Sequence, residues 1–266
     1  MNTPNAPVPA VDSSTVMVLR DGASGIEVLM LERHLDSDFV GGAYVFPGGK
    51  LDLSDQLSDD LWAGIDPEAE GARMGVAPAI AVGLYVAAVR ETFEEAGLLL
   101  AIRAGRPVTA GDLAEASFAE ARAKLNSRTL RWNWTDWLRS ERLVLDLSSL
   151  AWWSWWVTPI GVHRRFDTRF FVALAPEDQV AGHDDVETVH SVWTTPRGAL
   201  SAAAEGRAMV ILPTRKNLEQ LTMHATAQAA VDWAAEQTPP RIGPEIVDEG
   251  GRLVVRHDSF GSIEEV

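Results

Sequence analysis

Short apolar stretches alternate with turn residues over the first fifty positions. Residues 16–19 and 26–31 are apolar and flank a turn at 21–25 that contains two glycines, so we expect a β-hairpin. A third short strand is predicted at 43–46, directly before Pro47-Gly48-Gly49.

A long helix is predicted from Pro78 to about Gly97. Proline suits the first turn of a helix, and glycine suits the left-handed position that ends one. Four apolar side chains recur at spacings of three and four along this segment and mark its buried face: Val82, Val86, Val89 and Phe93.

The remaining pattern is irregular. We expect helices at 112–125, 135–143, 196–205 and 215–236, strands at 152–157, 166–174 and 186–193, and a terminal hairpin at 246–255. Residues 52–75 carry seven acids and no strong apolar period, so they are predicted to form a solvated surface insertion. This mixture of strands and helices predicts an α/β or α+β class with a mixed sheet covered by helices.

Composition narrows the functional classes. The 266 residues include no cysteine, which excludes a disulfide-stapled scaffold and a cysteine-zinc domain. The formal charge of −15 argues against a general nucleic-acid binder, which needs a basic face. The first ten residues lack the features of a secretory signal, and the longest apolar run, 79–89, is too short to span a membrane. We therefore expect a cytoplasmic protein without a membrane partner; its oligomeric state is not indicated.

The end of the long helix carries the most informative chemistry. Glu91, Glu94 and Glu95 lie at i, i+3 and i+4, so they share one face and repel one another. Oxygen ligands alone favour a hard cation, which makes Mg²⁺ or Mn²⁺ the expected ion. Arg90 can pair with Glu94 one turn on. The alternative, a solvated acidic face, does not require Arg90, Gly97 or the upstream Phe46-Pro47-Gly48-Gly49.

These residues resemble the signature of the Nudix hydrolase superfamily, Gly-x5-Glu-x7-Arg-Glu-U-x-Glu-Glu-x-Gly-U, where U is bulky and apolar. The matching positions are Gly49, Arg90, Glu91, Glu94, Glu95, Gly97 and Leu98. Two features depart from the pattern: Thr92 replaces an aliphatic residue, and 40 residues separate Gly49 from Arg90 where the pattern has 13. The isolated acid falls at Asp55 by direct count, with Asp52 as the alternative.

The long interruption is similar to a branch of Nudix enzymes related to the mammalian peroxisomal coenzyme A diphosphatase. Further similar segments lie at 20–22, 27–29, 45–52, 156–159 and 164–171. The resemblance implies a Nudix-type α/β/α sandwich over residues 13–238, with insertions at about 53–77 and 110–143. A flexible N-terminus, 1–12, and a C-terminal extension, 239–266, would flank it.

The resemblance also implies an activity: hydrolysis of the P–O–P linkage of a nucleoside-diphosphate derivative by metal-assisted attack of water. Coenzyme A or its thioesters are the first expected substrates; ADP-ribose, dinucleotides and nucleotide sugars stay open. By this resemblance, Glu91, Glu94 and Glu95 are expected to be metal ligands and catalytic residues. The Gly48 carbonyl would be a further metal ligand, and Arg90 would orient the carboxylates. It does not decide which glutamate is the general base.

Weaker candidates surround this motif. Glu187, six residues before Trp193, suits the further acid of many Nudix enzymes, with Asp184, Asp185 or a solvated loop as alternatives. Arg165 and Arg169 share one strand face and are candidates, with Gly49, for substrate contacts, although a structural salt-bridge ladder is favoured.

Tryptophans 152, 153, 155 and 156 are expected to pack in the core rather than to stack on substrate. Two other classes of function also stay open: a Nudix-like nucleotide-binding regulatory domain without catalysis, and a purely structural acidic protein. Three mutually repelling glutamates argue against the regulatory domain.

Overall fold

A computed structural model describes residues 8–34, 42–127, 132–183 and 188–263. Its centre is an eight-stranded mixed sheet. Six strands follow the order β11-β2-β1-β10-β9-β12, with β3 on β2 and β4 on β1. The bounds are β1 Val11–Gly22, β2 Gly25–Arg33, β3 Tyr44–Val45, β4 Gly48–Lys50, β9 Ala151–Val157, β10 Phe166–Leu174, β11 Thr188–Thr194 and β12 Arg241–Ile242. The parallel pairs are β1 with β10 and β9 with β12, so the predicted mixed sheet is confirmed.

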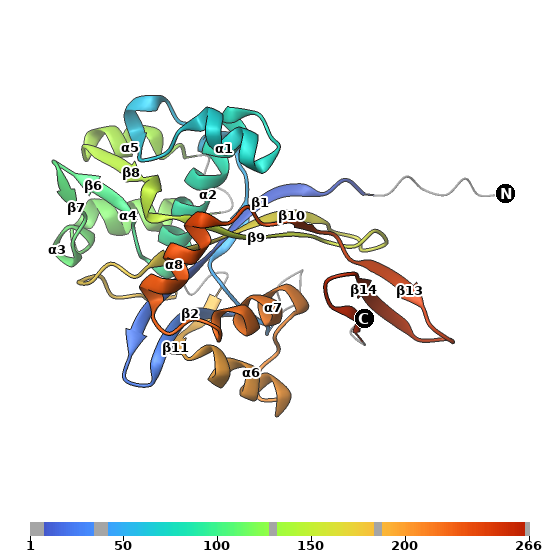
Figure 1. Cartoon of the computed structure of the whole chain (residues 1–266). Coiled ribbons are helices and arrows are strands. Elements are labelled where there is room, and N and C mark those ends of the chain that lie inside the picture. Colours follow the sequence, from blue (N-terminus) through green and yellow to red (C-terminus); the bar gives the residue numbers. More distant parts are fainter. Residues whose placement is uncertain (1–7, 35–41, 128–131, 184–187, 264–266) are drawn as a thin grey trace.

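Helices cover both faces of this sheet (Figure 1). In β1, Val16 and Val18 face one core cluster together with α2, Pro78–Ala96, whereas Met17 and Leu19 face a second cluster. The second cluster is closed by α6, α7 and α8, which span Pro196–Ala204, Leu212–Leu221 and Ala227–Glu236. Successive side chains of a strand point to opposite faces, so one apolar strand serves both cores.

The segment between β4 and α2 is more ordered than the sequence predicts. It contains two 3₁₀ turns, η1 (Leu53–Asp55) and η2 (Asp59–Leu61), the short strand β5 (Trp62–Ala63) and the helix α1 (Pro67–Met74). Asp55, Leu61 and Met74 are buried. The prediction of a solvated acidic loop is therefore wrong for these residues. No regular apolar period connects these positions along the chain, so the sequence pattern does not reveal their burial.

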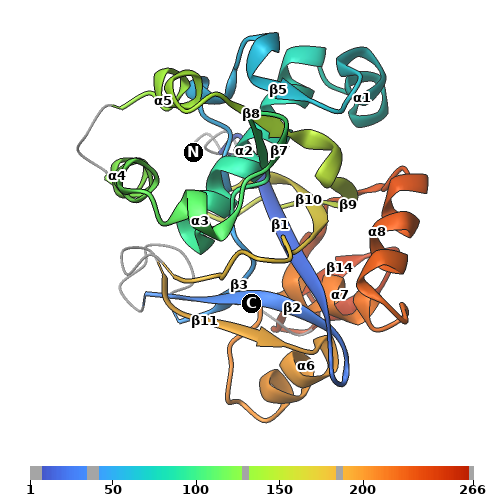
Figure 2. The same ribbon diagram turned by 90° about the vertical axis from the view of Figure 1, so that its left-hand side faces the viewer.

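A second, four-stranded sheet, in the order β5-β8-β6-β7, lies with three helices on the α2 side of the molecule (Figure 2). The strands are β6 Ala101–Arg103, β7 Arg106–Pro107 and β8 Leu143–Asp146, with the 3₁₀ turn η3, Leu147–Ser149, after β8. The helices are α3 Ala110–Leu113, α4 Ala116–Leu125 and α5 Thr135–Ser140. The predicted helix at 112–125 is thus two helices, because Glu115 takes an extended conformation between them.

The predicted helix at 215–236 is likewise two helices, α7 and α8. Thr226 is extended, and its side chain accepts a hydrogen bond from the Ala229 amide, so it caps a new helix rather than continuing the old one. The terminal hairpin is confirmed by β13 (Glu245–Asp248) and β14 (Leu253–His257), which continue into β15 (Gly261–Ile263).

Among the described residues, no single helix is long and apolar enough to cross a membrane. The pair α1 and α2 reaches that length only when taken together across a 92° bend.

Candidate active site

The carboxylates of α2 lie at the end of a helix whose other faces are buried. Val82, Val86, Val89 and Phe93 are all buried, as predicted. Gly97 ends the helix with φ of 70°, and its amide donates to the Phe93 carbonyl. Thr92, the departure from the family pattern, is fully buried, and its hydroxyl donates to the Ala88 carbonyl at 2.8 Å. A hydroxyl is tolerated there because it has a partner.

Arg90 is the hub of the site. Its Nε and Nη2 donate to the two oxygens of Asp55 at 2.7 and 3.0 Å, and Nη2 also donates to the Lys50 carbonyl at 3.0 Å. Its Nη1 donates to Glu91 Oε1 at 2.8 Å and to Glu94 Oε2 at 3.3 Å, the one-turn pairing expected from the sequence. One buried guanidinium therefore connects the inserted segment, β4 and two carboxylates of α2.

Of the two candidates for the isolated acid, Asp55 is the one that reaches Arg90. Asp55 is fully buried, whereas Asp52 caps η1 by accepting from the Ser54 amide at 2.9 Å. The Asp55 carboxylate in turn accepts from the Asp52 amide at 2.8 Å, which completes a capping box. The 3₁₀ turn therefore sets the position of Asp55, which faces Arg90 across the interruption in the motif.

Burial and neighbouring charges shift the pKa values of Asp55 and Arg90 in opposite directions. Burial raises the pKa of the Asp55 carboxyl, and the hydrogen bonds from Arg90 lower it part of the way back. Burial also lowers the pKa of Arg90, but the surrounding carboxylates of Glu91, Asp55 and Glu94 outweigh it and hold that pKa well above its ordinary value. Arg90 is therefore a permanent cation among acids.

Gly48 and Gly49 let the carboxylates approach the sheet. The Gly48 amide donates to Glu95 Oε2 at 2.9 Å. A Cβ on Gly49 would lie 2.2 Å from Glu91 Oε1, and one on Gly48 would lie 2.4 Å from the Ser14 carbonyl oxygen. Any larger residue would displace Glu91 or the β1–β4 pairing. The two glycines thus form a cradle for the carboxylates; a metal-ligand role for the Gly48 carbonyl stays a prediction.

The donor set suits a hard divalent cation. Three carboxylates on one helix face offer only oxygen, and the missing side chain of Gly49 leaves room for the Glu91 carboxylate. In the part of the chain that the structure describes, no three acidic or histidine side chains converge as a complete metal cage. The glutamates instead bond Arg90 and the Gly48 amide. Glu187, the predicted further acid, lies outside the described residues.

The predicted substrate arginines have partners inside the protein. Arg165 Nε donates to the carbonyls of Thr158 and Pro159 at 3.0 and 3.1 Å. Arg169 is buried, bonds Asp167, donates to Asp12 at 3.1 Å, and stacks on Trp155 with its guanidinium carbon 4.4 Å from the ring centre. Arg169 thus makes the structural salt bridge with Asp167 that the sequence favours, whereas Arg165 donates to main-chain carbonyls rather than to Asp167. Substrate binding by Arg165, Arg169 and Gly49 stays a prediction.

The tryptophan run of β9 belongs mainly to the core. Trp152, Trp153 and Trp156 are buried, with Trp153 packed edge-on against Trp233 at 4.9 Å between ring centres. Trp155 is partly exposed and donates to Asp167 Oδ1 at 2.5 Å. The expectation of core packing is therefore confirmed for three of the four.

Side chains of α4 cap the C-terminal end of α2, a contact absent from the expectations drawn from sequence. Arg122 donates to the carbonyls of Glu94, Glu95 and Gly182 at 2.9, 2.9 and 2.6 Å, and the Asn126 amide donates to the Glu94 carbonyl at 3.2 Å. The Gly182 amide donates to the Ala96 carbonyl at 2.9 Å. Together with Gly97, these groups bond all four terminal carbonyls of α2. Backbone partners of this kind leave no signature in a sequence.

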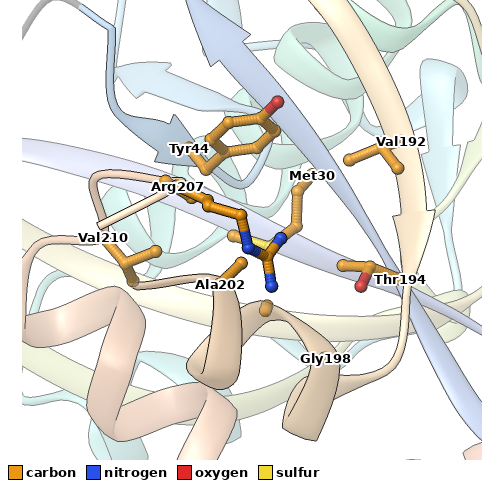
Figure 3. Close-up of a pocket in the computed structure, with 10 residues that line it drawn as sticks. Met30, Tyr44, Val192, Thr194, Gly198, Ala202, Arg207 and Val210 are labelled. Carbon is orange, nitrogen blue, oxygen red and sulfur yellow. The ribbon is translucent and has the colours of Figure 1, made fainter. Parts of the chain in front are cut away.

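Two hollows accompany the site. A groove of about 750 Å³ runs between the end of α2, the helices α3 and α4, and residues 180–183. A smaller cavity of about 230 Å³ lies between β2, β3, β11 and α6, where Arg207 extends between Tyr44 and α6 (Figure 3). Arg207 pairs with Glu205 at 2.8 Å, and no carboxylate among the described residues lines the smaller cavity. The carboxylate chemistry therefore belongs to the α2 side.

Comparison with solved structures identifies the class of fold to which this chain belongs. The crystal structure of a Nudix hydrolase from Alicyclobacillus acidocaldarius superposes with a TM-score of 0.69 at 28% identity, covering 89% of this chain and 99% of that one. The fold and the carboxylate helix are thus those of a Nudix hydrolase domain. A family model for the NUDT19 Nudix domain then matches residues 79–220, just over half of the chain, so the chain belongs to the NUDT19 Nudix family.

Curated relatives agree with this membership. The acyl-coenzyme A diphosphatase NUDT19 of Homo sapiens is 32% identical over 219 residues, which cover 66% of this chain and 55% of the relative. The Xenopus laevis protein of the same name is 27% identical over 215 residues, covering 68% and 56%. The chain therefore spans about half the length of the curated relatives it matches.

Proposed function

We propose that this protein hydrolyses the diphosphate linkage of coenzyme A and its acyl thioesters. The observation that carries the proposal is the carboxylate face of α2, held by Arg90 against the Gly48–Gly49 cradle. The names of the NUDT19 relatives, acyl-coenzyme A diphosphatases, supply the substrate class. Nudix hydrolases in general use divalent metals, and Mg²⁺ or Mn²⁺ is the proposed ion here because the donors are oxygens.

Each residue has a defined task in this proposal. Glu91, Glu94 and Glu95 hold the cation, which when bound neutralises phosphate oxygens and lowers the pKa of water. Arg90 orients Glu91 and Glu94 and prevents their repulsion from splaying them apart. Asp55 in turn fixes Arg90. Glu187 is proposed as a further acid, and the cytoplasm as the place of action.

A substrate panel tests the activity. Purified protein is incubated with Mg²⁺ or Mn²⁺ and, separately, coenzyme A, octanoyl-coenzyme A, ADP-ribose, a dinucleoside diphosphate and a nucleotide sugar. We expect coenzyme A and its thioester to be split into adenosine 3′,5′-bisphosphate and a phosphopantetheine product, detected by mass spectrometry. Glu94→Gln is the matched control, because it keeps the side-chain volume and removes the charge.

Each result has one meaning. Preferential cleavage of ADP-ribose, a dinucleotide or a nucleotide sugar would overturn the substrate assignment but keep a Nudix diphosphatase. Binding without cleavage, identical in the wild type and Glu94→Gln, would identify a regulatory nucleotide-binding domain instead.

A further inference from the structure

The groove beside the end of α2 has an amphipathic lining. Five residues of α4 and its C-cap recur at helical spacing and face the groove over about 12 Å, at 1.5 Å per residue: Phe118, Ala119, Arg122, Ala123 and Asn126. Across from them lies Val180, which is 84% exposed. A volume of about 750 Å³ is within the range of small-molecule sites, roughly 300–1,000 Å³.

One end of the groove adjoins the C-terminal end of α2. Asn126 and Arg122 line this end and donate to the main-chain carbonyls of Glu94 and Glu95. Gly97 is so close that a Cβ there would lie 3.0 Å from Arg122 Nη1. The α4 wall of the groove is therefore bonded to the backbone of two residues that carry the proposed metal ligands.

The other end is apolar. Ala114 and Ala119 are exposed, Leu113 is partly exposed, and Phe118 forms the floor. Exposed alanines beside an exposed valine leave an open, uncharged channel. An apolar ligand would remove these groups from water, and burial of apolar surface favours binding.

The lining of the groove favours the pantetheine half of the substrate over the nucleotide half. The described residues that line it include no lysine and no carboxylate, and its basic side chains are Arg122 and His183. Its one arginine, Arg122, already donates to three backbone carbonyls. A 3′-phosphorylated adenosine needs cationic partners for its phosphate, whereas a pantetheine arm needs amide partners at one end and apolar surface at the other.

We propose that this groove holds the acylated pantetheine arm of the substrate, with the diphosphate at the carboxylates and the acyl chain between Ala119 and Val180. This inference rests on the proposed function. It gives the helical segment around α3 and α4 a role in selecting acylated over free coenzyme A.

Two substitutions at the apolar end test the proposal. Ala119→Trp fills the channel, and Val180→Asp places a charge in it; both side chains are exposed, so neither change disturbs the core. Glu120→Trp is the control, since Glu120 is an exposed neighbour on α4 outside the groove. For each protein, kcat/KM is measured for octanoyl-coenzyme A and for free coenzyme A.

We expect Ala119→Trp and Val180→Asp to lower the octanoyl-to-free ratio of kcat/KM by about tenfold or more, because even one methylene in an apolar pocket is worth about 10–200-fold. Glu120→Trp should stay within about twofold of the wild type. Equal ratios in all four proteins would overturn the groove assignment while leaving the diphosphatase activity in place.

Equilibrium binding separates the two hypotheses. In a Glu94→Gln background, which suppresses turnover, calorimetry with octanoyl-coenzyme A should show about a tenfold higher Kd when Ala119→Trp is added. An unchanged Kd, or no binding of octanoyl-coenzyme A in either protein, would overturn the groove. Failure of the wild type to cleave any coenzyme A derivative would overturn the proposed function, whatever the binding result.

Discussion

Two of the arginine–carboxylate networks on the α2 side of the central sheet differ in the number of carboxylates around each arginine. Around α2, Arg90 bonds three carboxylates, those of Asp55, Glu91 and Glu94, while Glu95 accepts from the Gly48 amide. In the α3–α4 region, Arg103 and Arg106 bond three carboxylates, those of Asp112, Glu115 and Glu141.

The difference shows which network is built for stability. Asp112 is buried, accepts from both arginines and from the Thr109 amide, and caps α3. Nearly every charge in this network has an opposite partner nearby. The α2 network instead places three neighbouring carboxylates of one helix face beside a glycine cradle, an arrangement in which like charges repel one another. We expect this cluster to serve cation binding rather than stability.

The largest expected effect comes from removing one carboxylate of the α2 network. Glu94→Gln should lower kcat for diphosphate hydrolysis by more than about 100-fold, because even changes behind metal ligands cost about 10–100-fold. It should also weaken the rise in melting temperature that Mn²⁺ produces, measured by differential scanning fluorimetry. A wild-type response in both assays would contradict the metal site.

The second effect comes from the residue behind Arg90. Asp55→Asn removes a charged acceptor from the Arg90 guanidinium, so we expect kcat to fall about 10–100-fold and the Mn²⁺ concentration for half-maximal rate to rise. Asp52→Asn is the matched control: it touches the same 3₁₀ turn but does not bond Arg90. Equal losses of kcat in the two variants would show that activity depends on the 3₁₀ turn and not on the Asp55–Arg90 pair.

The third change disrupts the balanced network. Asp112→Asn should lower the free energy of unfolding by about 1–2 kcal/mol at neutral pH, through lost capping and charge-assisted hydrogen bonds. The Mn²⁺-induced rise in melting temperature should not change. Urea denaturation and fluorimetry together check both parts, and a loss of the metal response would mean that the two networks are coupled.

The same variant has a signed pH dependence. Hydrogen bonds from Arg106, with those of Thr109 and Arg103, hold the pKa of the Asp112 carboxyl well below its usual range. A carboxyl with a lowered folded-state pKa contributes stability above its unfolded pKa of about 3.9 and loses it as the pH falls. The difference in unfolding free energy between wild type and Asp112→Asn should therefore shrink below about pH 4.

The smallest effect belongs to the exposed edge of the balanced network. Glu115 is 47% exposed where it meets Arg103. Glu115→Gln should therefore leave the urea concentration at the unfolding midpoint nearly unchanged, because water screens exposed ion pairs. A marked fall in this midpoint would show that Glu115 supports Arg103 in holding Asp112.

The expectations drawn from sequence succeeded where local spacing decides structure. Three features of α2 depend on neighbouring residues alone: the spacing of its buried side chains, its proline start and glycine end, and the one-turn approach of Arg90 to Glu94. They failed where a contact depends on residues far apart in the chain. The burial of Asp55 follows from Arg90, 35 residues later, and the polar texture of its segment suggested a solvated loop.

The amino-acid sequence by itself determined the acidic face of one helix, the glycines that end it and precede it, and the mixed sheet beneath. Helical spacing and glycine's missing side chain act locally, so these features can be read in order along the chain. Only the tertiary structure decided which acid holds Arg90, that Arg122 and Asn126 cap α2, and that a groove opens beside it. Those features depend on backbone carbonyls and on space between distant segments, which side-chain identity does not encode.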